Sequence, residues 1–220
     1  TVTGDPGNRA GGIGAATDDP GSVTLQNTLV AGNTAPVGPD CTGQVASLGN
    51  NLIGNSTDCD FVAGTGDQVG TGVAPIDPKL GPLADNGGPT PTHALLKGSP
   101  AINAGGSGCT SADQRGAPRK DCDIGAYERV LCQKRVVNRV GTSGNEKLKG
   151  TGAKDGLLAL GGKDKLNGKG GADGLCGGPG KDTLMGGGGN DRLDGGPGKD
   201  LCVGAAGNDK AKGCETEQSV

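Results

Sequence analysis

The chain has 220 residues but only one Phe, one Tyr and no Trp. Nucleic-acid sites and protein interfaces usually depend on aromatic side chains for stacking and for anchoring, so this composition argues against both partner classes. The sequence also contains no apolar run long enough to span a membrane as a helix. We therefore expect no nucleic-acid partner and no membrane span.

The sequence also has few of the residues that bind zinc, because His93 is the single histidine and no two cysteines form a CxxC pair. A zinc site is therefore poorly supplied. Glycine, in contrast, is abundant at 48 residues, with 13 prolines. Such a composition often indicates disorder, but the net charge is only -3 and the glycines are periodic in the C-terminal part, which favours a folded repeat.

The chain contains eight cysteines. An even number in a glycine-rich chain with little hydrophobic core is typical of disulfides formed in an oxidising compartment, so we expect an exported protein. The chain opens at Thr1 without Met or a signal segment, and we expect a processed form or a fragment. The sequence alone does not fix the connectivity. Closeness along the chain favours the pairs Cys41–Cys59, Cys109–Cys122 and Cys202–Cys214, which leaves Cys132 to pair with Cys176.

From Gly141 to Lys212 the sequence divides into eight units of nine residues without insertion or deletion. Position 1 and position 4 are each Gly in seven of the eight units, and position 6 is acidic in all eight. Position 8 is small or apolar throughout. Flexible linkers do not keep four columns in phase, so the alternative of a glycine-rich linker is disfavoured.

The repeat has a direct physical interpretation as a coil of two units. Glycines permit a tight turn over the first six residues, and the last three form a short strand. Positions 6 and 8 then point inward together. We expect two inner apolar ladders, made of Leu148, Leu157, Leu166, Leu175, Leu184 and Leu193 and closed by Cys202 and Ala211.

The acids at position 6 stack in the same way along the two edges of the coils. Because coils repeat about every 4.8 Å, four like charges on each edge repel one another unless cations lie between them. Calcium suits this arrangement, since it accepts several oxygen ligands and the turns offer backbone carbonyls beside each carboxylate. Four acids leave three gaps on each edge, so roughly six ions is the upper bound.

The array resembles the RTX (repeats-in-toxin) nonapeptide family, whose pattern is GGxGxDxUx. The resemblance implies a parallel β-roll that holds Ca²⁺ between successive turns. The implied ligands are Glu146, Asp155, Asp164, Asp173, Asp182, Asp191, Asp200 and Asp209. An alternative is a roll that binds calcium poorly, because Lys154, Lys163, Lys181 and Lys199 occupy position 5. Departures from the pattern in the first units indicate that the best sites lie within 164–200.

The N-terminal half has a different pattern. Residues 22–33 and 47–55 alternate polar and apolar side chains between Gly, Asn and Pro turns, which predicts short strands of a right-handed parallel β-helix. The strings at 75–105 and 113–128 resemble the C-terminal end of the β-helix of choice-of-anchor Q type bacterial surface proteins. That family is defined by its architecture, so the resemblance implies surface display and little chemistry.

Some β-helix proteins are polysaccharide lyases or hydrolases, so paired carboxylates were weighed as catalytic groups. Asp18 with Asp19 and Asp58 with Asp60 are the candidates, with Arg115 or Arg119 as an electrostatic partner. Neither pair has a distinctive spacing. We favour no catalytic residues, and expect Asp113, Arg115, Asp123 and Glu128 to form polar contacts in the cap and His93 to be a structural hydrogen-bonder.

The sequence thus predicts an all-β chain: β-helix coils and cap over 1–129, a connecting segment over 130–140, and a calcium β-roll with a C-terminal cap over 141–220. The expected function is calcium binding as a folding clamp in a secreted or cell-surface structural or adhesive protein, not an enzyme. Its other partner would be a cell-surface glycan or another surface protein. The alternatives are a carbohydrate-active β-helix enzyme and a flat Thr/Asn face for ice or glycan, for which no regular Thr ladder exists.

Overall fold

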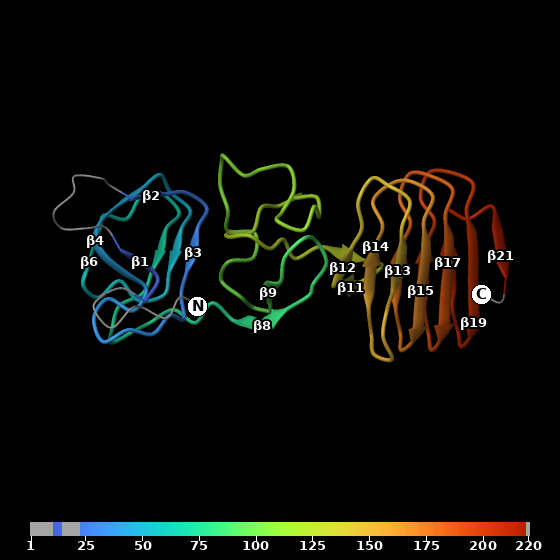
Figure 1. Cartoon of the computed structure of the whole chain (residues 1–220), viewed down its shortest axis with the longest axis horizontal. Helices are drawn as coiled ribbons and strands as arrows, with labels where there is room; N and C mark the ends of the chain where they lie inside the picture. Colours follow the sequence, from blue (N-terminus) through green and yellow to red (C-terminus); the bar gives the residue numbers. More distant parts are fainter. Residues whose placement is uncertain (1–10, 15–22, 219–220) are drawn as a thin grey trace. The chain divides into compact units, whose positions relative to one another are not determined.

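A computed structural model of the chain describes residues 11–14 and 23–218. These residues form strands, turns and irregular segments without any helix, so the expected all-β class is confirmed. It follows that the described part of the chain holds no apolar helix of membrane-spanning length. Almost all strand pairs are parallel, as expected of a β-solenoid (Figure 1).

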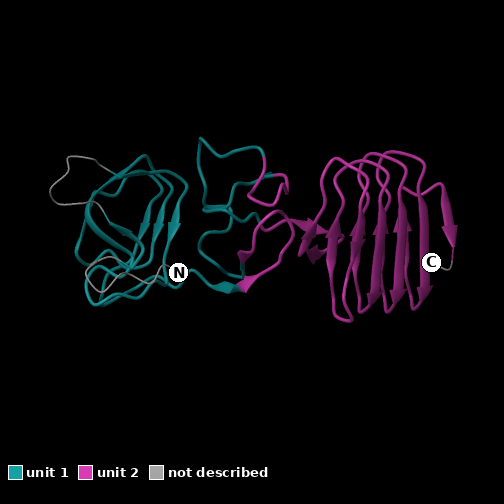
Figure 2. Cartoon of the chain, viewed as in Figure 1, with its two compact units in different colours: residues 1–82, 94–111, 119–128 teal, residues 83–93, 112–118, 129–220 magenta. Residues whose placement is uncertain are grey.

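The chain divides into two compact units (Figure 2). Unit 1 comprises residues 1–82, 94–111 and 119–128, and unit 2 comprises residues 83–93, 112–118 and 129–220. Two short segments that precede residue 129 therefore belong to the unit that contains the nonapeptide array. Their role there is described below.

Unit 1 contains two parallel sheets of short strands. One joins β1 (Ile13–Gly14), β4 (Cys41–Ser47), β2 (Val23–Leu25) and β6 (Cys59–Phe61), and the other joins β3 (Leu29–Val30), β5 (Leu52–Ile53) and β7 (Gln68–Val69). Val23, Val45 and Phe61 lie in register, so each strand adds one layer to an apolar core. These parallel strands agree with the short strands predicted within 22–33 and 47–55, whereas the polar–apolar alternation did not predict β4.

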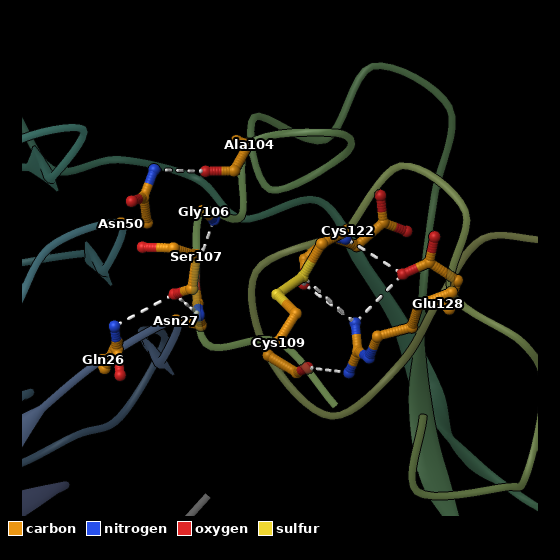
Figure 3. Close-up of a disulfide and its surroundings, with 12 residues drawn as sticks. Gln26, Asn27, Asn50, Ala104, Gly106, Ser107, Cys109, Cys122 and Glu128 are labelled. Atoms are coloured by element: carbon orange, nitrogen blue, oxygen red, sulfur yellow. Dashed lines mark hydrogen bonds and ion pairs between the residues drawn. A yellow bond between two sulfur atoms is a disulfide. The ribbon is translucent and has the colours of Figure 1, made fainter. Parts of the chain in front are cut away.

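The loops that follow these coils are held by side-chain hydrogen bonds. Figure 3 shows the Cys109–Cys122 disulfide near Glu128, whose carboxylate forms an ion pair of 3.0 Å with Arg119. In the same unit, the side chains of Gln26 and Asn27 donate to the carbonyl of Ser107. Strands β8 (Leu80–Ala84) and β9 (Thr92–Leu95) form a separate two-stranded sheet.

Unit 2 is a roll of two facing five-stranded parallel sheets. The first joins β12 (Arg139–Val140), β14 (Gly156–Leu158), β16 (Gly174–Cys176), β18 (Arg192–Asp194) and β20 (Lys210–Lys212). The second joins β13 (Lys147–Lys149), β15 (Lys165–Gly170), β17 (Thr183–Gly188), β19 (Leu201–Ala206) and β21 (Thr216–Gln218). We call them the first and second roll sheets.

The expected turn-and-strand division is confirmed, since every strand within the array covers positions 7 to 9 of a unit. In β15, β17 and β19 the strand continues for three further residues. Leu148 aligns with Leu166 and Leu184, and Leu157 aligns with Leu175 and Leu193. The two leucine ladders form one buried cluster that ends at Cys202 and Ala211, as predicted.

The segment 130–140 packs against the outer face of the first roll sheet. Strands β10 (Leu131–Cys132) and β11 (Arg135–Val136) form an antiparallel hairpin, and β12 begins the sheet itself. A Cβ at Gly174 would lie 2.3 Å from the carbonyl oxygen of Cys132, and one at Gly156 would lie 2.3 Å from that of Val136. Glycine at position 7 of these two units therefore admits the hairpin.

The segments 83–93 and 112–118 complete this end of unit 2. Asp113 and Arg115 form a fully buried ion pair of 2.9 Å, and Arg115 also donates to the carbonyl oxygens of Asn86 and Val137. Asp85 forms an ion pair of 2.6 Å with Arg139 in β12. The expected polar contacts of Asp113 and Arg115 are thus confirmed, but they lie in the unit of the roll.

All four favoured disulfides are confirmed, with Cα–Cα distances of 5.3, 6.5, 6.0 and 5.9 Å in chain order. Cys41–Cys59 joins β4 to β6, and Cys132–Cys176 joins the hairpin to β16. Cys202–Cys214 closes the last coil. Three of the pairs lie 12 to 18 residues apart in the sequence, so closeness along the chain was a sound guide to them, whereas Cys132 and Cys176 are separated by 44 residues and were paired by elimination.

Replacing Ala205 by glycine is expected to stabilise the roll. Ala205 has φ 79° and aligns with Gly187 at φ 103°, so its Cβ occupies a left-handed backbone conformation that favours glycine. Ala205→Gly should raise the free energy of unfolding by about 1 kcal/mol. The matched control, Ala206→Gly, lies next to it in β19 and should lower that free energy by about 0.5–1 kcal/mol. Denaturant unfolding of both variants tests this, and equal destabilisation would contradict it.

Candidate metal centre

The position-6 acids lie inside the roll at the start of each strand. Seven of the eight are buried, with exposed fractions from 0% to 6%: Asp155, Asp164, Asp173, Asp182, Asp191, Asp200 and Asp209. Glu146 is half-buried. They are inward-facing because position 8, two residues later on the same side of the strand, carries the leucine of the core. The expected inward orientation of both positions is confirmed.

Each carboxylate is tied to the coil before it by one oxygen. The backbone N–H of Asp155 donates to Oδ1 of Asp173, 18 residues later, at 2.8 Å. The same bond recurs at 2.7–2.8 Å from residues 146, 164, 173, 182 and 191 to the acid 18 residues further on. The acids therefore form two continuous ladders, one along each edge of the roll, which we call the carboxylate ladders.

Two residues outside the nonapeptide array end these ladders. Asn138 donates to Oδ1 of Asp155 at 2.7 Å and accepts from the N–H of Gly156. At the other end, Glu215 accepts from the N–H of Asp200 at 2.5 Å. The nonapeptide pattern predicted neither residue. Both could have been found as polar residues that lie close to 18 residues from a ladder acid, since Asn138 precedes Asp155 by 17 residues and Glu215 follows Asp200 by 15.

The second oxygen of most ladder carboxylates has no partner. Oδ2 is buried and accepts no hydrogen bond within the described residues in six of the aspartates: Asp164, Asp173, Asp182, Asp191, Asp200 and Asp209. Buried polar atoms are almost always hydrogen-bonded in folded proteins, because desolvation without a partner is unfavourable. Six unpartnered oxygens in phase with the repeat indicate that the roll is built to receive a positive charge at this row.

The two carboxylates nearest the start of the array differ from these six. Oδ2 of Asp155 accepts from the backbone N–H and the hydroxyl of Thr151, at 2.6 and 2.9 Å. Glu146 is hydrogen-bonded to Thr142 in the same way. Threonine at position 2 of the first two units therefore satisfies their acids within the protein. The structure separates Glu146 and Asp155 from the other six acids.

Glycine at position 1 makes room for the unpartnered oxygens of Asp173, Asp182, Asp191 and Asp200. A Cβ at Gly168 would lie 2.3 Å from Oδ2 of Asp173 and 2.6 Å from the carbonyl oxygen of Gly186, in the next coil. At Gly177 the corresponding distances, to Oδ2 of Asp182 and to the next coil's carbonyl, are 2.5 and 2.6 Å. A carboxylate oxygen and a carbonyl oxygen from successive coils thus approach the same space, which any larger residue would fill.

Burial without a counter-charge changes the acidity of the ladder. Desolvation raises the pKa of Asp173 to about 6, and the neighbouring charges of Asp191 and Asp155 add to this increase. Burial also raises the pKa of Asp164, Asp182, Asp191 and Asp200. The ionised ladder is therefore unfavourable on its own, and a bound cation would offset this cost.

The donor set suits a hard cation. Among the described residues, no three Asp, Glu, His or Cys side chains gather around one point. A zinc-type site made of side chains alone is therefore not formed there. Calcium accepts carboxylate and backbone carbonyl oxygens together, and both are present at this edge of every inner coil. The residues present fit calcium.

Of the two carboxylate pairs considered as catalytic candidates, Asp18 and Asp19 lie outside the described residues. Asp58 and Asp60 are both exposed. Arg119 is committed to Glu128 and to the carbonyl oxygens of residues 123 and 125. His93 is half-buried in β9.

Unit 1 has a groove of about 320 Å³ lined by Asp40 and Asp77 together with prolines and asparagines. Asp40 is buried, and both of its carboxylate oxygens accept hydrogen bonds, from Asn33 and from the N–H of Asn55. It therefore supports the backbone turns around it. The lining residues include neither Asp58 nor Asp60.

The metal-free roll is expected to be most stable in acid. The ladder aspartates have higher pKa values in the folded chain than the ordinary value of 3.8, so the folded state binds more protons above that pH. Their stabilising effect is present below pH about 4 and is lost as pH rises through about 6. In excess chelator, the melting temperature should fall between pH 4.5 and pH 7.5, and Asp173→Asn should reduce the fall. A melting temperature that rises over this range would contradict the assignment.

Comparison with known proteins agrees with this geometry. Residues 140–175 and 177–211 match the model of the RTX calcium-binding nonapeptide repeat, in four copies. The chain has no significant match among curated proteins or among solved structures. The matched segments span β12 to β20 and every ladder acid from Glu146 to Asp209. The resemblance of this segment to RTX repeats is therefore confirmed, and such repeats bind calcium in a β-solenoid.

Proposed function

We propose that calcium acts as a folding and stability clamp in this protein, which serves outside the cell as a structural or adhesive β-solenoid. The observation that carries the proposal is the row of six buried, unpartnered Oδ2 atoms in phase with the repeat. The proposed ligands are these six aspartates with turn carbonyls from adjacent coils. Glu146 and Asp155, which Thr142 and Thr151 already satisfy, contribute little to binding.

The clamp follows from linkage between binding and folding. Only the rolled chain brings carboxylates 18 residues apart into one ladder, so the unfolded chain lacks the site. The free energy of calcium binding is then added to the free energy of folding. Calcium supplies the positive charge that balances the ionised carboxylates. Each ion then contacts two successive coils, which holds them together.

The roll is closed at both ends by groups other than calcium. Cys132–Cys176 fixes the entry hairpin, and Cys202–Cys214 fixes the last coil. Disulfides need an oxidising environment, and calcium sites of modest affinity need an environment rich in calcium. These features together support an extracellular location, on the cell surface or in the medium.

A surface protein of the choice-of-anchor Q type fits unit 1 as a proposal. Its parallel strands and its loops tied by Cys109–Cys122 provide an extended scaffold. Its described carboxylates are exposed or hydrogen-bonded to nearby backbone, which favours a structural role over a carbohydrate-active enzyme.

Substitution in the ladder tests the proposal. Asp182 lies in mid-ladder with a buried, unpartnered Oδ2, so Asp182→Asn should remove at least one calcium site or weaken it about tenfold. Asp194→Asn is the matched control, because Asp194 faces outward and pairs with Lys212 at 2.8 Å. Calorimetric titration of the intact chain with calcium measures both, with circular dichroism followed in parallel.

Saturable binding by the native chain, preserved in Asp194→Asn and reduced in Asp182→Asn, is the expected result. The same titration in native protein should raise the melting temperature at pH 7.5. If millimolar calcium releases no heat and leaves the melting temperature unchanged, the roll is held by its leucine ladders and disulfides alone, and the proposal is wrong. The intact chain is used because residues 83–93 and 112–118 pack within unit 2.

A further inference from the structure

Charge is sorted by sign between the inside and the outside of the roll. From 141 to 212 the sequence has 11 basic and 9 acidic residues. Eight of the nine acids are the position-6 residues that point inward, and the ninth, Asp194, pairs with Lys212. The basic side chains are outside. A roll whose sequence is nearly neutral therefore presents a positive surface.

The outer face of the second roll sheet carries most of this charge. Lys147, Lys149 and Lys165 are exposed at positions 7 and 9 of β13 and β15, where strand alternation turns them away from the core. Lys163, Lys181 and Lys199 are exposed at position 5, in the turns that lead into β15, β17 and β19. We call these six residues the lysine face: Lys147, Lys149, Lys163, Lys165, Lys181 and Lys199. Figure 1 shows β13, β15, β17 and β19 stacked side by side, and Lys163, Lys181 and Lys199 recur at the same position of successive coils. At position 7, Lys147 and Lys165 are followed in register by Thr183 and Leu201.

Within residues 11–14 and 23–218, the six lysines of the lysine face are not paired with acidic side chains; the exposed acids of the same sheet, Glu215 and Glu217, lie at its end, in and next to β21. None of the ion pairs found in the described part of the chain involves these six lysines. In β13 and β15, Lys147 lies in register with Lys165, one strand spacing apart. Like charges placed opposite each other are unfavourable in a sheet, so this arrangement serves no purpose in folding. The first roll sheet differs, since the β10–β11 hairpin covers part of its outer face.

The carboxylate ladder lies directly behind the lysine face. Asp164 sits between Lys163 and Lys165 in the sequence and points the other way. Without calcium, the ionised ladder offsets the field of these lysines. Calcium neutralises the ladder from within, so the positive potential at the face increases when calcium binds.

We propose that the lysine face binds an anionic polysaccharide and that calcium loading strengthens this binding. The calcium dependence rests on the proposed function; the lysine face itself does not. Rows of lysine repeat about every 4.8 Å along the roll, and a linear polyanion places its charges at a comparable repeat. Counterions released from such a chain drive association in the same way as for other polyanions.

The composition of the face favours a polysaccharide over the other polyanions. It contains no arginine for bidentate phosphate contacts and no aromatic ring on which a base could stack, since Phe61 and Tyr127 lie in unit 1. It also lacks the exposed aromatic anchors typical of membrane-surface binding. The lysine ammonium groups act as point charges, and such a row suits carboxylated or sulfated glycans.

Binding of fluorescently labelled dextran sulfate to the intact chain tests the inference, with uncharged dextran as the matched probe. In calcium, dextran sulfate should bind and dextran should not, and the affinity should fall steeply between 50 and 200 mM salt. The double variant Lys147→Gln with Lys165→Gln should bind about tenfold more weakly. The control double variant Lys154→Gln with Lys210→Gln removes two lysines outside the lysine face and should bind nearly as the native chain does.

Calcium titration of the same variants separates this inference from the proposed function. If calcium binds normally but the Lys147 and Lys165 variant keeps full affinity for dextran sulfate, the lysine face is not the site and the inference is overturned. Tighter binding of duplex DNA or of phosphatidylglycerol vesicles, at equal charge, would overturn the choice of polysaccharide. If dextran sulfate binds through the lysine face equally in calcium and in chelator, the calcium coupling is wrong; if the calorimetry also shows no calcium binding, the proposed function itself fails.

Discussion

The unbalanced carboxylate ladder is the constraint on which the roll depends. From Asp164 onward, each unit places an aspartate at the edge of a narrow core, where one oxygen accepts a hydrogen bond from the preceding coil and the other is left without a partner. The first bond sets the register between coils, and the second oxygen leaves a charge that the protein does not compensate. Register and charge imbalance therefore come from the same side chain, and a cation that relieves the imbalance also draws the coils together.

The rest of unit 2 can be understood from this constraint. Glycine at position 1 leaves space beside the carboxylate, and the leucine at position 8 fills the core that the carboxylate borders. Where threonine stands at position 2, the acid is satisfied locally and the ladder begins without need of a metal. Asn138 and Glu215 continue the hydrogen bonding past the array, and disulfides hold both ends. Disulfides thus stabilise the ends of the roll, and we propose that calcium stabilises its inner coils.

Sorting of charge gives the same fold a second use. Because every coil points its acid inward, the outward positions are free to carry lysine, and a nearly neutral segment becomes a positive surface over a negative interior. Neutralising the interior with calcium changes the field outside without moving any surface residue. Calcium would then control both the proposed structural clamp and the proposed polyanion-binding face.

The sequence by itself determined the nine-residue period, the inward pairing of acid and leucine and the all-β class. These features are local or repeat at a fixed spacing, so side-chain alternation and turn chemistry suffice to derive them. Closeness along the chain also gave three disulfides, and elimination gave the fourth, Cys132–Cys176. Only the tertiary structure decided that residues 83–93 and 112–118 belong with the roll, that a hairpin covers Gly156 and Gly174, and that Thr151 satisfies Asp155 while Asp173 has an unpartnered oxygen. The first two outcomes depend on which segments meet in the folded chain, and contacts between residues far apart in sequence leave no periodic trace by which to predict them. The third is local, but the repeat pattern does not show whether a side chain at position 2 donates to the acid four residues later.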